Sequence, residues 1–209
     1  MPLAAQPPVV RSVRKSRRRF AGFTLLELMI VVAIVGITTA LAAPAMVRAM
    51  AISRANRANH DLLRVVRFAR SQSMAFGRSY LMHVITSGTT TRAEIWEGTT
   101  SACRLEDWST IMSQGSCGTT NPGNCVDVVD STMYASSGHS VQFADGGVDL
   151  CFQSNGEMLT RTSTSSGPFA YPTAGYIQFT TTRLENGSSA GDPLRGVIIP
   201  IGGAPRALR

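Results

Sequence analysis

An almost unbroken run of apolar and small residues, from residue 23 to residue 43, restricts the fold of this chain more than any other feature. The run carries one charged residue, Glu27, and stays apolar or small as far as Val47. As a helix, its 21 residues would extend about 30 Å, which is the thickness of the hydrocarbon core of a bilayer. The sequence therefore predicts a helix that can cross a membrane.

Basic residues on either side of this run predict its orientation. Six precede it and three follow it closely: Arg11, Arg14, Lys15, Arg17, Arg18 and Arg19 before, and Arg48, Arg54 and Arg57 after. Because the more positive flank stays in the cytoplasm, we expect residues 1–22 there and the rest of the chain outside.

The N-terminal cluster also accounts for most of the net charge. The 209 residues include 20 Lys and Arg against 13 Asp and Glu, a formal charge of +7. Without the six N-terminal basic residues the balance is 14 to 13, or +1. A polyanion-binding domain is therefore not the expected class.

Glu27 argues against two simple explanations of the apolar run, a plain membrane anchor and a secretory signal peptide. An acidic group in a bilayer costs about 3 kcal/mol even on insertion scales, so a plain anchor has no use for it. A secretory signal peptide has an apolar core of about 7 to 15 residues before an A-x-A site. Residues 40–42 read ALA, but the run before them is too long. A carboxylate that snorkels to the interface near Arg19 remains an alternative.

Residues 22–27 read GFTLLE directly after the basic leader. This arrangement resembles the class III signal of type IV prepilins and type II secretion pseudopilins, which have a small residue at the cleavage site, then Phe, and Glu shortly after. The resemblance implies that a membrane-embedded prepilin peptidase cleaves between Gly22 and Phe23 on the cytoplasmic side and methylates the new N-terminus at Phe23.

Glu27 and Pro44 are the assembly residues that this resemblance implies. Cleavage creates an α-amine at Phe23 that is largely cationic at neutral pH, and it can pair with Glu27 of a neighbouring subunit. Because an ion pair at low dielectric must offset two desolvations, only the correct axial stagger is favourable. Pro44 would loosen the helix for filament packing; a helix that ends as it leaves the membrane is the alternative.

A second helical pattern follows at residues 47–78. Small and apolar residues recur at steps of three and four, within an arc of about 100°, and Gly77 is the expected end. The stripe consists of Ala51, Ala55, Ala58, Leu62, Val65, Val66, Ala69 and Ser73, and arginines 57, 64, 67, 70 and 78 lie opposite. With residues 23–46 this predicts one long helix, its second half covered by a β-sheet.

The charge of this helix contrasts with that of the remaining chain. Residues 48–78 have seven basic residues and one acidic residue, whereas residues 79–209 have seven basic and eleven acidic residues. A solvated helix face explains this, and so does attraction between the basic helix of one subunit and the acidic sheet of another. Binding of lipid head groups or nucleic acid is a third alternative.

Beyond Gly77 the chain reads as short β-strands between Gly, Ser, Thr, Asn and Pro clusters. Asn155-Gly156 predicts a hairpin with a type I′ turn, and Gly202-Gly203 predicts a second turn. Strands are expected at residues 80–86, 92–96, 126–134, 141–143, 148–153, 157–161, 175–181 and 195–201, with loops at 99–124, 163–172 and 186–193.

Four cysteines lie in the second half of the chain: Cys103, Cys117, Cys125 and Cys151. None forms a C-x-x-C pair, so zinc binding and thioredoxin-like chemistry fit poorly, and no cofactor or metal is expected. In an exported domain we expect disulfides, and all three pairings stay open.

Later residues narrow the resemblance to the GspH/FimT/FimU group of minor pseudopilins and minor pilins. Residues 61–78 are similar to the end of that group's long helix, residues 152–156 to its F-x-P-x-G hairpin with Ser154 in place of proline, and residues 195–203 to its closing strand and turn. The implied fold is α+β and pilin-like: a long N-terminal helix, transmembrane and then amphipathic, packed on a C-terminal antiparallel β-sandwich-like domain.

The expected organisation has four parts: a cleaved leader at residues 1–22, a transmembrane and assembly helix at 23–46, an amphipathic helix at 47–78 and a periplasmic β-rich domain at 79–209. The implied function is structural. The subunit is anchored in the bacterial inner membrane, with its N-terminus cytoplasmic, and is assembled near the tip of a type II secretion pseudopilus or a type IV pilus. Expected partners are the prepilin peptidase, other minor pseudopilins or pilins, the major subunit and the inner-membrane assembly platform.

Two other function classes are an enzyme and a DNA-binding protein. An enzyme is not expected, because His60, His83 and His139 are isolated and neither G-x-S-x-G nor H-E-x-x-H occurs. DNA binding for natural transformation is the alternative, because some FimT proteins use a C-terminal Gly-Arg-x-Arg motif. The Gly-Arg junction is missing here, but Arg206 and Arg209 can each contact a phosphate.

Overall fold

The computed structural model describes residues 23–115, 117–118, 123–136, 138–144, 147–162, 167–191 and 195–208. The expected leader, Gly22 and Arg209 lie outside these ranges. The chain divides into two compact units, Met1–Pro44 and Ala45–Arg209, and each is described by itself.

Helix α1 (Leu25–Phe76) is continuous over 52 residues. It begins after Thr24, whose hydroxyl accepts a hydrogen bond from the N–H of Glu27 at 3.2 Å. It ends before Gly77, which has a φ of +67° and donates its N–H to the carbonyl of Ser73. Glycine adopts this left-handed conformation without a steric cost, and the end expected at Gly77 is confirmed.

The buried residues of α1 all lie in the second unit and follow the expected stripe. Each of the eight stripe positions is buried, and Asn59 and Leu63 are buried beside them. Arginines 57, 64, 67 and 78 are exposed, whereas Arg70 is half-buried. The helical period of the sequence therefore identified the packed face correctly.

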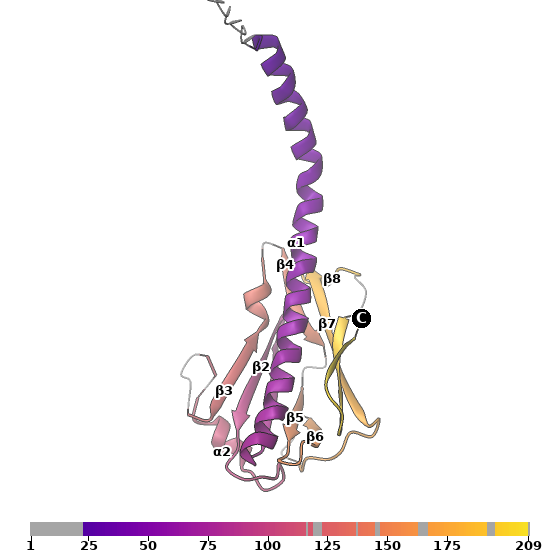
Figure 1. Cartoon of the computed structure of the whole chain (residues 1–209). Coiled ribbons are helices and arrows are strands. Elements are labelled where there is room, and N and C mark those ends of the chain that lie inside the picture. Colours follow the sequence, from indigo (N-terminus) through magenta and orange to yellow (C-terminus); the bar gives the residue numbers. More distant parts are fainter. Residues whose placement is uncertain are drawn as a thin grey trace, which may run out of the picture. The chain divides into compact units, whose positions relative to one another are not determined.

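Two antiparallel sheets pack with α1 in the second unit (Figure 1). One has the strand order β3-β2-β1-β5-β6, and the other has the order β10-β9-β7-β4 with β8 paired to β7. The strands are β1 (Tyr80–Ser87), β2 (Thr90–Glu97), β3 (Cys125–Asp130), β4 (His139–Ala144), β5 (Val148–Phe152), β6 (Met158–Thr162), β7 (Tyr176–Glu185), β8 (Ser188–Ser189), β9 (Arg195–Pro200) and β10 (Arg206–Leu208). The fold is thus a long apolar helix followed by antiparallel β-sheets, as expected.

The main hydrophobic core is shared by α1 and both sheets. Leu62 and Val65 of α1 belong to one buried cluster with Met82 of β1, in the first sheet, and with Phe179 and Val197 of β7 and β9, in the second. Side chains alternate between the two faces of a strand, so Leu81, next to Met82, belongs to a different cluster. That second cluster covers the opposite face of the first sheet.

Residues from the long loop after β2 build the second cluster. Trp108 and Ile111 come from α2 (Trp108–Met112), a helix of five residues whose N-cap is Asp107. They pack with Cys103 and Cys117 against the sheet residues Leu81, Trp96, Cys151 and Leu159. The indole of Trp108 donates a hydrogen bond to the carbonyl of Cys103 at 3.1 Å, so this loop has a packed core of its own.

The eight expected strands all occur, but three details differ. Residues 131–134 form a 3-10 helix, η1 (Ser131–Tyr134), instead of continuing β3, because Asp130 caps it through the N–H of Thr132. Neither α2 nor the short strands β8 and β10 were expected. The hairpin at Asn155-Gly156 exists without a type I′ turn: only Gly156 has positive φ (+79°), because the loop has three residues and needs one left-handed position.

Candidate functional site

The expected assembly segment lies in the first turn of α1. Thr24 is the N-cap, and Glu27 is the third helical residue after it. The spacing of Thr24 and Glu27 is that of a capping box, in which the hydroxyl and the carboxylate bond the free N–H groups of the first turn. A negative charge at this end also interacts favourably with the helix dipole. The helix thus offers Glu27 a local role besides pairing with an amine of a neighbouring subunit.

The apolar side chains of this segment are exposed. Phe23 is 81% exposed, Leu25 76% and Leu41 75%, and no described residue from 23 to 50 is buried. Such a surface is far larger than the patches that soluble monomers expose. One helix in the described part of the chain, α1, is long and apolar enough to cross a membrane, and its most apolar window has a mean hydropathy of 2.4. Lipid or the helices of other subunits can cover it.

The few polar groups in the segment are bonded within the helix. The hydroxyl of Thr38 donates to the carbonyl of Ile34 at 2.9 Å, and the hydroxyl of Thr39 donates to the carbonyl of Val35. In hydrocarbon such groups need internal partners. Pro44 lies inside α1, which continues for 32 further positions to Phe76. The helix therefore does not end at Pro44, and the proline removes one backbone donor within it.

The structure pairs the four cysteines as Cys103–Cys151 and Cys117–Cys125. The first bond joins the loop after β2 to β5 across a sequence separation of 48, and the second joins residues 8 positions apart at the start of β3. Cys103, Cys117 and Cys151 lie in the second hydrophobic cluster. The cysteines therefore attach the loop to the sheet at two places.

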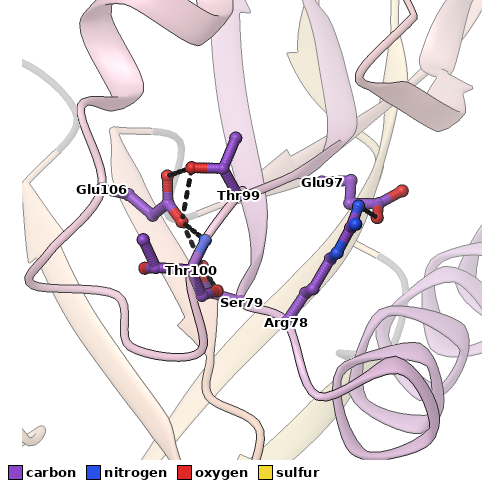
Figure 2. Close-up of polar contacts among 6 residues, drawn as sticks. All are labelled: Arg78, Ser79, Glu97, Thr99, Thr100 and Glu106. Atoms are coloured by element: carbon purple, nitrogen blue, oxygen red, sulfur yellow. Dashed lines mark hydrogen bonds and ion pairs between the residues drawn. The ribbon is translucent and has the colours of Figure 1, made fainter.

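Glu106 attaches the same loop at a third place (Figure 2). Its carboxylate accepts hydrogen bonds from the hydroxyl of Thr99 at 3.2 Å, from the hydroxyl of Ser79 at 3.4 Å and from the N–H of Thr100. Ser79 lies between the end of α1 at Phe76 and the start of β1 at Tyr80, so the carboxylate connects the loop to the junction between α1 and β1. Beside it, Arg78 pairs with Glu97 at 2.6 Å.

Charged side chains are also buried on the first sheet. Asp149 is fully buried and accepts from Nε of Arg161 at 3.0 Å, while Nδ1 of His83 lies 2.5 Å from its other oxygen. These residues lie side by side on β6, β5 and β1, and the guanidinium of Arg161 also stacks on the ring of Phe169 at 4.5 Å. Within the described ranges no group of three or more His, Cys, Asp or Glu residues can hold a metal ion. We interpret His83, Asp149 and Arg161 as a structural network.

The C-terminal arginines of the DNA-binding alternative are only partly described. Arg206 is exposed in β10, and Arg209 lies outside the described residues. Nε and Nη2 of Arg67 donate to the carbonyl of Pro205 at 3.1 and 3.0 Å, which ties the segment before β10 to α1. No contact with DNA follows from this geometry, and the alternative stays a prediction.

Comparisons with known proteins bear on the N-terminal segment. A family model described as the prokaryotic N-terminal methylation motif matches residues 17–43. The match includes the end of the basic leader, the expected cleavage junction, Glu27 and the apolar run, and it supports the resemblance to type IV pilin-like proteins. The roles of Gly22, Phe23, Glu27 and Pro44 remain predictions.

Two searches extend the comparison to whole chains. No curated protein matches this sequence. Among solved structures, the type IV minor pilin FimU of Pseudomonas aeruginosa strain PAO1 is similar at 13% sequence identity and a TM-score of 0.41, over 74% of this chain and 87% of that chain.

Proposed function

We propose that this chain, which carries the prokaryotic N-terminal methylation motif, is a structural subunit that prepilin peptidase processes and that assembles near the tip of a type IV pilus or a type II secretion pseudopilus. The observation that carries the proposal is the motif at residues 17–43, joined to a helix whose apolar side chains are exposed throughout the described residues 23–50. Such a surface needs lipid before assembly and helices of other subunits after it.

The location and partners follow from the same segment. Before assembly the subunit is held in the bacterial inner membrane, with its N-terminus in the cytoplasm, because the basic flank precedes the apolar run. Its partners are then the prepilin peptidase, the assembly platform, the major subunit and other minor subunits. The proposed role is structural and assigns no catalytic activity to this chain.

Glu27 acts in this proposal after the leader has been removed. The uncut chain has a peptide bond at Phe23 and therefore no cation there, so Glu27 has no amine to pair with. Cleavage creates the amine, and a subunit in the wrong axial position leaves an unpaired charge in a medium of low dielectric, which is costly. Cleavage thus permits assembly, and the ion pair selects the register.

A pair of substitutions at Glu27 tests this role against the capping role. Glu27→Gln removes the charge but retains a side chain that suits a capping box, whereas Glu27→Ala removes both. If pairing with an amine is the function, both variants are cleaved normally and both are lost from the filament fraction, by about tenfold or more. The measurement is the mass of the mature chain together with its amount in sheared filaments.

Three outcomes would contradict the proposal at separate steps. Normal incorporation of Glu27→Gln with loss of Glu27→Ala assigns Glu27 to capping alone. Replacement of Gly22 by a bulky residue such as leucine should block cleavage, and a mature chain of unchanged mass from that variant would refute the assigned cleavage site. A wild-type chain that never enters a filament fraction would refute the function itself.

A further inference from the structure

A basic groove lies beside α1 in the second unit. It has a volume of about 400 Å³, which is within the range of ligand pockets. One wall carries Arg54, Arg57 and Arg64 of α1, and the other is formed by residues of β3 and η1, among them Met133. Met133 is 76% exposed although it is a large apolar residue. The groove therefore combines cations with exposed apolar surface.

The acidic residues of this groove and its rim are bonded within the chain. Asp127 accepts a hydrogen bond from Nη1 of Arg64 at 2.8 Å, and Asp61 accepts one from the hydroxyl of Tyr134 at 2.6 Å. Burial and the bond to Asp61 raise the pKa of Tyr134, so its hydroxyl keeps the proton that this bond requires. Neither acid forms an ion pair with the other two arginines of the groove within the described ranges.

Unpaired positive charge gathers at the beginning of this unit's part of α1. Residues 45–60 contain three arginines, Arg48, Arg54 and Arg57, and no acidic residue. None of the three forms an ion pair in the part of the chain that the structure describes. Their planar guanidinium groups suit two-point binding of a phosphate or a carboxylate from outside the chain.

Exposed apolar side chains directly precede the groove in the same unit. Met46, Val47 and Met50 are exposed, and burial begins only at Ala51. Arg54 follows Val47 by seven positions, or about 10 Å along a helix. Polar headgroups occupy about 5 to 8 Å on each side of the hydrocarbon core, and long basic side chains on a helix lean toward its N-terminus and reach such an interface. A bilayer that covers Val47 therefore holds phosphates within reach of Arg54.

We propose that this groove binds the headgroup phosphate of an anionic phospholipid, in the outer leaflet of the inner membrane, before the subunit is assembled. Arg54 and Arg57 would bind the phosphate oxygens, and Met133 would cover the glycerol beside them. The ammonium group of phosphatidylcholine is repelled by the same arginines, so phosphatidylglycerol should be preferred. The inference rests on the proposed function for its location, and it adds a contact that orients the domain on the membrane until the subunit is extracted.

A photo-crosslinking amino acid in place of Met133 tests the contact in the full chain. The chain is reconstituted in nanodiscs of phosphatidylcholine alone or of an equal mixture with phosphatidylglycerol, and mass spectrometry identifies lipid-peptide adducts. We expect phosphatidylglycerol adducts at position 133. The matched control is the same replacement of Leu105, which is 72% exposed. Its neighbour Glu106 contacts Ser79, beyond the other end of α1, so position 105 should form no adduct.

Charge variants test whether the arginines select the lipid. Arg54→Gln and Arg57→Gln should each lower the adduct at position 133 about fivefold, the effect of one basic residue near an anionic surface. Arg104→Gln makes the same charge change next to Leu105 and should leave the adduct unchanged. Added inorganic phosphate should not displace the lipid, because the bilayer holds its phosphates at a high local concentration. Fluorescence of the buried Trp96 and Trp108 verifies that each variant is folded.

Several results would overturn the contact. Equal adducts with and without phosphatidylglycerol, or an adduct that persists in Arg57→Gln, would exclude recognition of the phosphate. Equal adducts at positions 105 and 133 would show only that lipid touches exposed apolar residues. Displacement by inorganic phosphate would assign the groove to a soluble anion. In cells, a crosslink from position 133 to protein alone would assign it to an acidic partner.

The nanodisc measurement does not depend on assembly, so the two proposals fail separately. Peptidase processing and recovery in the filament fraction are measured in cells. A chain that is processed and recovered there, but forms no lipid adduct at position 133 in nanodiscs, defeats this inference alone. A chain that never enters the filament fraction defeats the proposed function, whatever the nanodiscs show.

Discussion

At the scale of single residues, a glycine in β9 shows how closely the second sheet is packed. Gly196 pairs with Thr180 of β7, and a Cβ atom at Gly196 would lie 2.1 Å from the carbonyl oxygen of Phe179. Because that oxygen belongs to the backbone, it can move only if the strands separate. The position therefore requires glycine for space, although its backbone conformation is ordinary.

Gly196→Ala should consequently destabilise the domain by about 1 to 3 kcal/mol or more, the range for overpacked cores. Denaturant unfolding of the chain in detergent, followed by tryptophan fluorescence, measures this change. Gly202→Ala is the control, because nothing lies within 4 Å of a Cβ there and its φ is ordinary. Equal stabilities for the two variants would contradict the close approach of β9 and β7.

A second prediction at this scale concerns acid. The hydroxyl groups of Ser109 and Thr110 and the N–H of Thr110 donate to Asp107, and they lower its pKa from 3.8 to about 2. A carboxyl group whose pKa is lower in the folded state stabilises the fold above its unfolded pKa. That stability is lost as the pH falls through the folded pKa, so the window for Asp107 is from about pH 4 down to about pH 2.

Asp107→Asn keeps a good N-cap but cannot ionise. The difference in unfolding midpoint between wild type and this variant should therefore be constant above about pH 4 and shrink as the pH approaches about 2. Midpoints measured at several pH values check this directly. A difference that does not change with pH would show that the charge of Asp107 contributes nothing to stability.

At the scale of elements, two disulfide bonds join the first sheet to the loop after β2, and they close segments of chain of different length. The Cys103–Cys151 bond closes a loop of about 48 residues, and the Cys117–Cys125 bond closes one of about 8. The entropy removed from the unfolded chain grows with loop length, so on this account the bonds contribute about 4 and about 2.5 kcal/mol. The longer bond also holds the loop with α2 against β5.

Replacement of each pair by serine should reveal this order. Removal of Cys103 and Cys151 is expected to destabilise the domain by about 1.5 kcal/mol more than removal of Cys117 and Cys125. Non-reducing peptide mapping of the wild type first establishes the pairing, and denaturant unfolding of the two double variants then gives the stabilities. The opposite order would indicate that chain entropy is not the main contribution of the longer bond.

At the scale of the whole molecule, the chain consists of two units with different environments. The described residues 23–50 are exposed and mostly apolar, whereas every buried residue of α1 lies at Ala51 or beyond. None of the buried residues of α1 therefore lies in the first unit, and in the proposed function lipid or other subunits cover the apolar side chains of that unit.

A chain that lacks residues 1–44 should accordingly stay folded and remain in solution without detergent. Its free energy of unfolding should match that of the full chain in detergent within about 0.5 kcal/mol, because none of the removed side chains that the structure describes is buried. Tryptophan fluorescence and sedimentation measure both properties. Aggregation of the shortened chain, or a clearly lower midpoint, would show that residues 23–44 stabilise the second unit.

The sequence by itself determined the features that depend on neighbouring residues. The apolar run and the GFTLLE junction are continuous stretches of the sequence. The buried stripe from Ala51 to Ser73 follows the helical period, which reports the buried face, and the eight main strands are short runs between turn residues. The hairpin at Asn155-Gly156 was predictable because Asn-Gly favours a tight turn, although its turn type was not, because loop length depends on the strand register.

Only the tertiary structure decided the features that join distant residues. It chose one of three disulfide pairings, the strand order of both sheets and the position of η1, because these depend on which surfaces pack together. The short elements α2 and β10 have weak local signals and exist through contacts, such as the burial of Trp108 and the pairing of Arg206 with Ile198. A groove lined by Arg54, Arg57 and Arg64 of α1 arose in the same way, since its apolar wall at residues 128–134 lies about 70 positions further along the chain.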